Sequence, residues 1–268
     1  MPFICPLCQQ VLHYAERIYR CEQNHCFDEA KAGYVNLLLA QHKRSREPGD
    51  SKAMLQSRQR FLNAKYYEPL ADRISEWVKK LNPSSLIDMG CGEGYYLARI
   101  LSDVENAPEV VGIDIAKPAV HMAARRKMGA DLAVASAYQL PVADQSMDLA
   151  LSVFSPVSPE EVSRVLKPGG YLLMVGPGPE HLQVLIAHIY DNPQPHEGNT
   201  VTEDVPGLQK ITEDALSFEL RVSGEHVFDL LTMTPYYWKC NQEQQKSFQH
   251  MDALQTPVDF YLRVYQRI

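Results

Sequence analysis

The pattern of apolar and polar positions along the chain predicts an α/β domain. Apolar residues recur at helical spacing from Met54 to Leu81, which predicts one or two helices that end at Asn82. Beyond them, short apolar runs predict strands at residues 85–89, 110–114, 130–135, 147–153 and 170–175. The segments between these runs predict helices at residues 95–102, 117–127 and 158–166. Such alternation is typical of a parallel, doubly wound sheet of the Rossmann type.

The two ends of the chain differ from this regular middle part. The C-terminal pattern predicts a helix at residues 181–190, a Pro-rich loop at 191–206, a strand at 217–224, a helix at 225–233 and a final strand at 260–267. At the N-terminus, four of the six cysteines lie within the first 26 residues. A polar stretch from Gln41 to Ser51 follows, and its Pro48-Gly49-Asp50 turn predicts a linker or a binding loop.

Composition adds a charge asymmetry to this picture. Hydrophobic residues make up 45% and charged residues 22%, as in an ordinary globular protein. The net charge is −7, but residues 1–60 hold nine Lys/Arg against six Asp/Glu, which leaves 17 against 27 for the remainder. A local +3 beside −10 favours an anionic partner at the N-terminal part, or else a solvated basic face.

The apolar runs and the first residues bear on location. No apolar run approaches the length of a membrane span, so no membrane partner is expected. The opening residues MPFICPLC lack the basic and apolar regions of a signal peptide. We therefore expect a cytoplasmic protein, in which cysteines are more often thiols or metal ligands than disulfides.

The early cysteines have the spacing of a zinc site. Cys5 and Cys8 are followed, after twelve residues, by Cys21 and then by the neighbours His25 and Cys26. Two Cys pairs on tight knuckles can form a closed tetrahedral site, so we expect a structural zinc ion. The spacing leaves both His25 and Cys26 open as the fourth ligand. The predicted domains are a zinc-binding module (1–40), a basic linker with helices (41–81) and a catalytic domain (82–268).

A glycine-rich loop follows the first predicted strand and indicates a ligand site. It runs from Asp88 and contains three glycines: Gly90, Gly92 and Gly94. Between a strand and a helix, such a loop binds a dinucleotide or S-adenosylmethionine. Asp88 would repel a pyrophosphate but would attract an ammonium or sulfonium group. Asp114, at the end of the second strand, can accept both ribose hydroxyls, and the stretch from Ser136 to Asp144 is where an adenine would lie.

The middle of the chain resembles the class I methyltransferases. The series DMGCGEG, GID, an acidic loop before Met147-Asp148, and LKPGG occurs in the order and spacing of that family across roughly residues 84–178. The resemblance implies S-adenosylmethionine as the cofactor.

The chain as a whole resembles the bacterial 23S ribosomal RNA guanine-N1 methyltransferases. The matching segments are CPLC, the Cys21-x3-His25 spacing, FDxAKxGYVNLL, QHKRSREPGDS, GPGPxHL and LTMTPYYW. This resemblance implies a homodimer that methylates a guanine in a hairpin of domain II of 23S rRNA. It also implies zinc on Cys5, Cys8, Cys21 and His25. The cofactor contacts that it implies are Tyr67, Gly92, Glu93 and His181.

The expected reaction is an in-line attack of guanine N1 on the sulfonium methyl group, and the proton that neutral guanine carries on N1 must pass to a base before or during the transfer. Phe154 and Pro156 follow the fourth strand and are expected near the target base, where an aromatic ring could stack. Ser152 stands where relatives carry an arginine, so any role of that arginine is in doubt here. Asp148 lies on the strand and is expected to be too far back to act as the base, which stays unassigned.

Basic residues in the polar stretch are candidates for RNA phosphate contacts. They are Lys43, Arg44 and Arg46, with Arg58 and Arg60 on the following helix as lesser candidates. Two other interpretations stay open. A small-molecule methyltransferase could use the zinc module as a buttress, and a zinc-dependent RNA-binding protein could retain a vestigial cofactor site.

Overall fold

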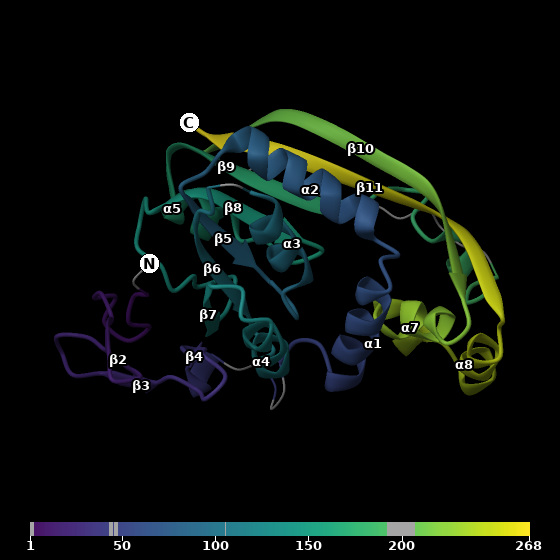
Figure 1. The fold of residues 1–268 in the computed structure, drawn as a ribbon, viewed down its shortest axis with the longest axis horizontal. Coiled ribbons are helices and arrows are strands. Elements are labelled where there is room, and N and C mark those ends of the chain that lie inside the picture. Colours follow the sequence, from purple (N-terminus) through teal and green to yellow (C-terminus); the bar gives the residue numbers. More distant parts are fainter. Residues whose placement is uncertain (1–2, 43–44, 46–47, 105, 192–206) are drawn as a thin grey trace.

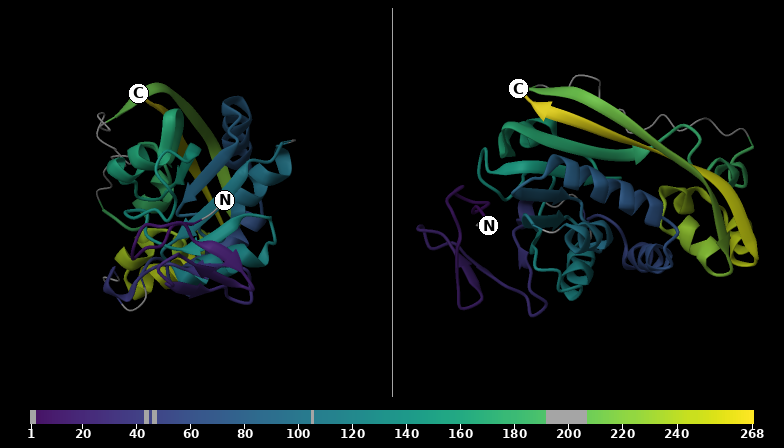
Figure 2. Two further views of the ribbon diagram at one scale, coloured as in Figure 1. Left: turned by 90° about the vertical axis from the view of Figure 1, so that its left-hand side faces the viewer. Right: turned by 45° about the horizontal axis from the view of Figure 1, so that its top comes forward.

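The computed structural model describes residues 3–42, 45, 48–104, 106–191 and 207–268 (Figure 1). Its central feature is an eight-stranded sheet with the strand order β10-β11-β9-β8-β5-β6-β7-β4. The strands of the parallel part are β4 (Val35–Asn36), β5 (Ser85–Met89), β6 (Glu109–Asp114), β7 (Asp131–Val134), β8 (Met147–Val153) and β9 (Leu166–Pro177). Apolar residues fill these strands, because helices cover both faces of the sheet (Figure 2).

Most of the helices lie where the apolar periodicity predicted them. They are α1 (Lys52–Asn63), α2 (Glu68–Leu81), α3 (Tyr95–Asp103), α4 (Lys117–Arg125), α5 (Pro159–Val165), α6 (Gln183–Ala187), α7 (His226–Thr232) and α8 (Gln242–Gln249). Two short 3-10 helices are η1 (Ala40–His42) and η2 (Pro235–Lys239). The expected helix at residues 181–190 is shorter than predicted, because Leu182 adopts a φ of 59° and α6 begins only after it.

The predicted parallel sheet is present, and two C-terminal strands extend it at one edge. There β10 (Leu208–Ser223) and β11 (Ala253–Arg267) pair antiparallel with each other, and β11 pairs antiparallel with β9. Both strands begin well before the predicted residues 217 and 260. The early part of β10 alternates between exposed and half-buried side chains, so its apolar signal is weak.

The helix α8 was not predicted. Its sequence is almost entirely polar, and only Phe248 is buried. A capping box identifies its start: Asn241 accepts a hydrogen bond from the backbone of Gln244, whose side chain accepts one from the backbone of Asn241. This local signal could have located the helix without any apolar periodicity.

The N-terminal module is built into the main fold. Its own sheet consists of β1 (His13–Ala15), β2 (Ile18–Arg20) and β3 (Cys26–Asp28), at the opposite end of the molecule from α7 and α8 (Figure 1). The next strand, β4, pairs with β7 at the edge of the central sheet. Phe3 and Leu12 are buried in the same core as Ile87, and the backbone N–H of Ile4 donates to the carbonyl of Pro141. Residues 3–40 therefore share both a sheet and a core with the rest of the chain.

None of the helices in the described part of the chain combines the length and the apolarity that crossing a lipid bilayer requires.

Candidate functional site

The glycine loop leaves β5 at the carboxyl edge of the parallel strands. The backbone N–H groups of Gly90 and Cys91 both donate to the carbonyl of Ile113, which fastens the loop to β6. Gly90 has a φ of 85°, and a Cβ there would lie 2.1 Å from Ser155 Oγ. At Gly94, with a φ of 81°, a Cβ would lie 2.6 Å from Met128 Cε. Both positions therefore require glycine for conformation and for space.

Asp88 is the last but one residue of β5 and is buried beneath this loop. Its side chain is 2% exposed, and Oδ1 has no hydrogen-bond partner among the described residues. Burial, and secondly the nearby charge of Asp114, raises the pKa of Asp88 to about 8. A buried carboxylate with an unmatched oxygen is suited to a cationic ligand group, so Asp88 fits the ammonium group of S-adenosylmethionine.

Asp114 is held at the carboxyl end of β6 by two backbone groups. Its Oδ2 accepts from the N–H of Gly92 at 3.0 Å, and its Oδ1 accepts from the N–H of Ala116 at 2.7 Å. Burial raises the pKa of Asp114, while these two hydrogen bonds act in the opposite direction. Each oxygen keeps acceptor capacity, so the fixed carboxylate could receive ribose hydroxyls.

The side chain of Glu93 is committed to an internal ion pair. Its carboxylate is buried and pairs with the guanidinium of Arg126, whose Nε lies 3.0 Å from Oε2 and 2.7 Å from the Glu93 carbonyl. Burial raises the pKa of Glu93, and Arg126 opposes this shift. A cofactor contact at Glu93 would therefore involve its backbone. The sequence did not identify Arg126, because nothing local links it to residue 93.

The stretch expected to surround an adenine is fixed by a residue that sequence reasoning missed. Ser136 follows β7, and its Oγ accepts from the N–H of Tyr138 at 3.1 Å. Downstream, Arg164 donates to the carbonyls of Leu140 and Val142 and to Asp144, each at 2.8–2.9 Å. A single guanidinium on α5 thus holds the loop in place, which the order of elements along the chain does not reveal.

Four aromatic rings form a cluster beside the glycine loop. Tyr67 and His181 are buried, with Tyr67 Oη 3.5 Å from His181 Nε2, while the backbone N–H of Asp259 donates to His181 Nδ1. Phe260 packs against both rings, at centroid distances of 5.1 Å from Tyr67 and 4.8 Å from His181. Phe154 lies 6.3 Å from the ring of His181. The structure thus brings Tyr67 and His181 together and adds Phe260, which no sequence motif marked.

Phe154 is the member of the cluster that reaches solvent. Its side chain is 40% exposed and its φ is 55°, an unfavourable value for a bulky residue. Its backbone N–H is held by the carbonyl of Val175. Ser152 donates to the carbonyl of Ser155 at 2.9 Å and so stabilises this turn. Pro156 follows and is exposed. Backbone strain at an exposed aromatic residue is typical of a functional position.

The charged residues that the sequence offered as RNA contacts or as the base differ in their surroundings. Arg58 pairs with Asp50 and donates to the carbonyl of Met233, and Arg60 pairs with Asp229, so both are engaged within the protein. Asp148 accepts from Lys167 and from the backbone at the start of β5. Asp148 therefore lies at the amino-terminal ends of the parallel strands, whereas the glycine loop lies at their carboxyl ends. This distance excludes Asp148 as the base. The predicted RNA contacts Lys43, Arg44 and Arg46 lie outside the described residues.

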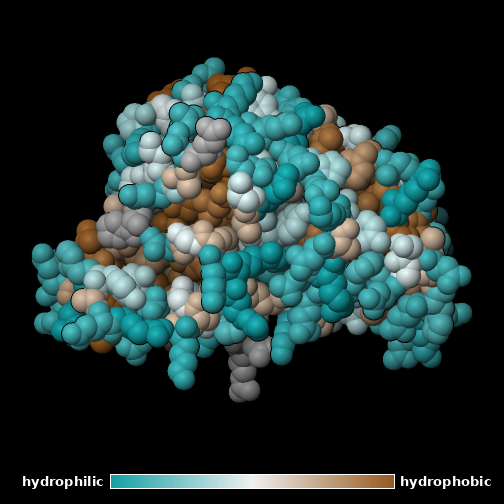
Figure 3. All heavy atoms as spheres, viewed as in Figure 1, coloured by the Kyte–Doolittle hydropathy of each residue, from teal (hydrophilic) through white to brown (hydrophobic). Residues whose placement is uncertain are grey.

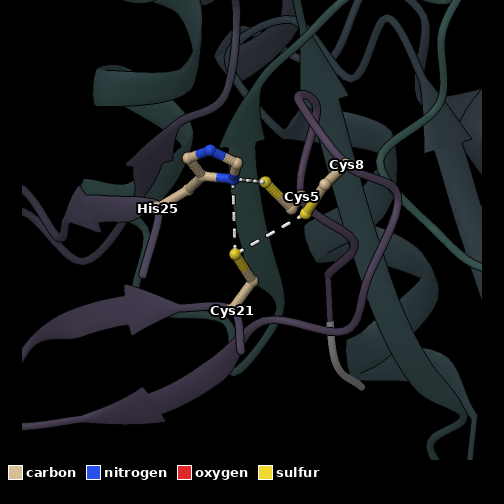
Figure 4. Close-up of side chains that lie close together, drawn as sticks. All are labelled: Cys5, Cys8, Cys21 and His25. Carbon is tan, nitrogen blue, oxygen red and sulfur yellow. Dashed lines mark hydrogen bonds between the residues drawn. The ribbon is translucent and has the colours of Figure 1, made fainter. Parts of the chain in front are cut away.

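Two tight knuckles bring the potential zinc ligands together. In the first, the N–H of Gln9 donates to the carbonyl of Cys5, and in the second, the N–H of Asn24 donates to that of Cys21. Gln9 and Asn24 both have a φ of 62°. These turns point the thiols of Cys5, Cys8 and Cys21 and the ring of His25 at one another (Figure 4). Their ligand atoms all lie within 4.8 Å of one another.

The distances in this cluster fit a tetrahedral zinc ion. His25 Nδ1 lies 3.4 Å from both Cys5 Sγ and Cys21 Sγ, and Cys8 Sγ lies 3.6 Å from Cys21 Sγ. Zinc bonds of about 2.3 Å to sulfur and about 2.0 Å to nitrogen give tetrahedral edges of roughly 3.5–3.8 Å. Cys26 is exposed and directs its thiol to the carbonyl of Asn24 instead. The geometry therefore selects His25 over Cys26, which the spacing left open.

Comparisons with known proteins agree with this two-part site. A family model described as RlmA, N-terminal, a zinc ribbon, matches residues 3–46, and a methyltransferase domain model matches residues 86–170. These matches confirm the zinc module and the S-adenosylmethionine-dependent methyltransferase domain that the sequence predicted. Among solved structures, the MccD protein has a TM-score of 0.49 over 75% of this chain and 98% of that chain, at 16% identity.

Curated relatives extend the match to most of the chain. The 23S rRNA (guanine(748)-N(1))-methyltransferase of Streptomyces fradiae is 34% identical over 244 residues, which cover 87% of this chain and 85% of that protein. A Micromonospora griseorubida protein, provisionally named a 23S rRNA (guanine-N(1)-)-methyltransferase, is 37% identical over 68% of each chain. With its zinc ribbon and its glycine loop both in place, this chain belongs to the family of the 23S rRNA guanine-N1 methyltransferases.

Proposed function

We propose that this protein transfers the methyl group of S-adenosylmethionine to N1 of a guanine in a hairpin of domain II of 23S rRNA. The observation that carries the proposal is the contact between Gly90 and Ser155, which places the exposed ring of Phe154 next to the cofactor loop. An exposed aromatic ring at that position can stack on a base that has been turned out of its helix. The similarity to rRNA methyltransferases identifies that base as guanine.

The chain's residues have distinct roles in holding the cofactor, which supplies the electrophilic methyl group. Asp88 binds its ammonium group, and Asp114 binds its ribose hydroxyls. Gly90, Gly92 and Gly94 admit it close to the backbone, together with the backbone of Glu93. Ser136 lies at the adenine end, and Tyr67 and His181 are the further cofactor contacts. These contacts align the acceptor nitrogen with the methyl carbon, so that catalysis is mainly a matter of orientation.

Zinc has a structural role in this proposal. Cys5, Cys8, Cys21 and His25 fill all four positions of a tetrahedral ion and leave none for a substrate. Because the module's strand β4 extends the catalytic sheet, the ion also stabilises the edge of the sheet next to β7.

The wider assembly follows the same family. The protein acts in the cytoplasm as a homodimer, in which the two zinc modules help to frame a cleft for the RNA. Lys43, Arg44 and Arg46 contact RNA phosphates there. Arg58 and Arg60 stay lesser candidates, because their guanidinium groups already pair with Asp50 and Asp229.

Primer extension on 23S rRNA tests the substrate directly. RNA from cells with and without the gene is reverse-transcribed across domain II. A methyl group on N1 blocks base pairing, so reverse transcriptase stops one nucleotide before the methylated guanine. A stop that requires the protein, and that returns when the wild-type gene is supplied on a plasmid, supports the proposal. If the profiles are identical over the whole large-subunit RNA, the rRNA assignment fails. Methylation of a panel of small metabolites would then be the next measurement.

A further inference from the structure

One segment of the catalytic domain has a charge opposite to that of the chain as a whole. Between Asp114 and Asp131 the sequence contains four Lys/Arg and neither Asp nor Glu, although the whole chain has a net charge of −7. The segment comprises α4 and the turn that follows it. Such a concentration of positive charge in an acidic protein indicates either a surface that binds an anionic partner or a solvated face.

The exposed basic side chains of α4 lie on one face of the helix. Lys117, His121 and Arg125 follow one another at intervals of four residues, and all three are exposed. The opposite face, including Ala119 and Val120, is buried. Among the described residues, neither Lys117 nor Arg125 has a hydrogen-bond or ion-pair partner, whereas the neighbouring Arg126 is paired with Glu93. The charges of Lys117 and Arg125 are therefore available to an external anion.

Both ends of α4 adjoin the cofactor site. At its start, the N–H of Ala116 donates to Asp114, the proposed ribose ligand, and at its end Arg126 pairs with Glu93 in the glycine loop. The helix that carries this basic face therefore adjoins the ribose and glycine-loop side of the cofactor site. A ligand bound to that face would flank the cofactor.

The same helix also contacts the N-terminal part of the chain. The ring of His121 meets that of Tyr34, which precedes β4, edge-on at 6.1 Å. A Cβ on Gly49, within the polar stretch 41–51, would lie 2.9 Å from Cβ of Ala116, at the buried start of the helix. Figure 3 shows mainly hydrophilic residues where α4 lies in Figure 1. Lys117 and Arg125 are about two helical turns apart, so an extended anion matches the face better than a small one.

We propose that the Lys117–His121–Arg125 face of α4 binds the phosphate backbone of the substrate RNA on the ribose side of the cofactor site. The inference rests on the proposed function, since it names the path of the same RNA. Cations in a row bind phosphates without reading bases, so this face positions the RNA and contributes affinity rather than sequence specificity.

The test compares two pairs of charge deletions in the full-length, zinc-loaded protein. One variant is Lys117→Ala/Arg125→Ala. The matched control is Lys79→Ala/Lys80→Ala, which removes two exposed cations from the end of α2, next to the start of β5 and thus at the opposite edge of the sheet. Binding of a domain II transcript of 23S rRNA is measured by fluorescence anisotropy at several salt concentrations. S-adenosylmethionine binding is measured in parallel by calorimetry.

The expected result is a selective change in RNA binding. The α4 variant should bind the transcript at least tenfold more weakly at low salt, and the slope of log K against log salt should fall by roughly one to two. Its cofactor affinity, and both properties of the control, should match wild type. Equal slopes for the α4 variant and wild type would overturn the inference while leaving the proposed function intact. If wild type itself neither binds nor methylates the transcript, it is the proposed function that fails.

Discussion

Gly90 packs against Ser155 so closely that a single added carbon would lie 2.1 Å from the serine hydroxyl oxygen. The two residues belong to different loops, one after β5 and the other after β8. Ser155 is held in turn by Ser152, which donates to its carbonyl. The cofactor loop and the turn that carries Phe154 are therefore coupled by direct contact, and a change in one displaces the other.

This contact predicts a large effect of Gly90→Ala. The substitution adds a clash with Ser155 to the strain of a φ of 85°, so both stability and S-adenosylmethionine affinity should fall. Gly169→Ala is the matched control, because Gly169 has a φ of 78° but no atom within 4 Å of its Cβ position. The control should lose only about 1–2 kcal/mol, the cost of the backbone strain alone. Thermal denaturation and calorimetry measure the two effects, and equal losses in both variants would contradict the crowding.

Because Asp88 is buried, its ionisation should lower the free energy of unfolding as the pH rises. The Asp88→Asn variant should not show this pH dependence. The pKa of Asp88 is about 8 in the folded protein, against about 3.9 in an unfolded chain. Between these values the folded state retains a proton that the unfolded state has lost. Raising the pH through this window therefore favours unfolding, and the effect levels off above about pH 8.

Urea denaturation from pH 5 to pH 9, without cofactor, measures this cost. The stability of wild type relative to Asp88→Asn should decline steadily up to about pH 8. The same variant should bind S-adenosylmethionine about 10- to 100-fold more weakly, because it loses a charge-assisted hydrogen bond. Parallel stability curves for the two proteins would show that Asp88 is ionised in the fold.

The zinc cluster predicts different consequences for two neighbouring residues. His25→Ala should lower the zinc content measured by atomic spectroscopy, while Cys26→Ser should keep it at the wild-type value, because the Cys26 thiol points away. Removal of zinc by a chelator should also lower the melting temperature of the whole protein, since Phe3 and Leu12 belong to a core shared with the central sheet. Zinc loss from Cys26→Ser would reverse the ligand assignment.

The ion pair between Arg126 and Glu93 predicts a strong effect on stability. Arg126→Leu leaves a carboxylate that is 2% exposed without its partner, and the cost should be about 3–5 kcal/mol in urea denaturation. Adding Glu93→Gln removes the stranded charge and should recover most of the loss. If the double variant is no more stable than Arg126→Leu, the charge is not the cause.

Phe154 is expected to act on the RNA and not on the cofactor. Stacking on a base contributes about 1–3 kcal/mol, so Phe154→Ala should lower kcat/KM for the transcript between about fivefold and a hundredfold. Phe154→Tyr keeps the ring and should retain most of the activity. The affinity for S-adenosylmethionine should be unchanged in both variants. If Phe154→Ala weakens only the binding of S-adenosylmethionine, the ring contacts the cofactor and not the RNA.

Much of the site was determined by local sequence. The strands at Ser85–Met89 and Met147–Val153 lie where the apolar runs predicted them, because buried parallel strands have a continuous apolar signature. The glycine loop and the knuckle cysteines could also be predicted from the sequence, since the turns they form depend on residues a few positions apart. Asp88 and Asp114 could be located by the same logic, as the ends of two such strands.

The tertiary structure decided everything that depends on distant residues. It brought His25 to the cysteines, as the family resemblance implied and the spacing alone did not, placed Phe260 against Tyr67 and His181, and paired Arg126 with Glu93. It also turned the C-terminal strands into an antiparallel edge, where alternating polar residues gave only a weak apolar signal. The physical reason is that periodicity and spacing encode each element's own conformation and buried face. Which side chains then meet depends on how the elements pack, and that is a property of the whole chain.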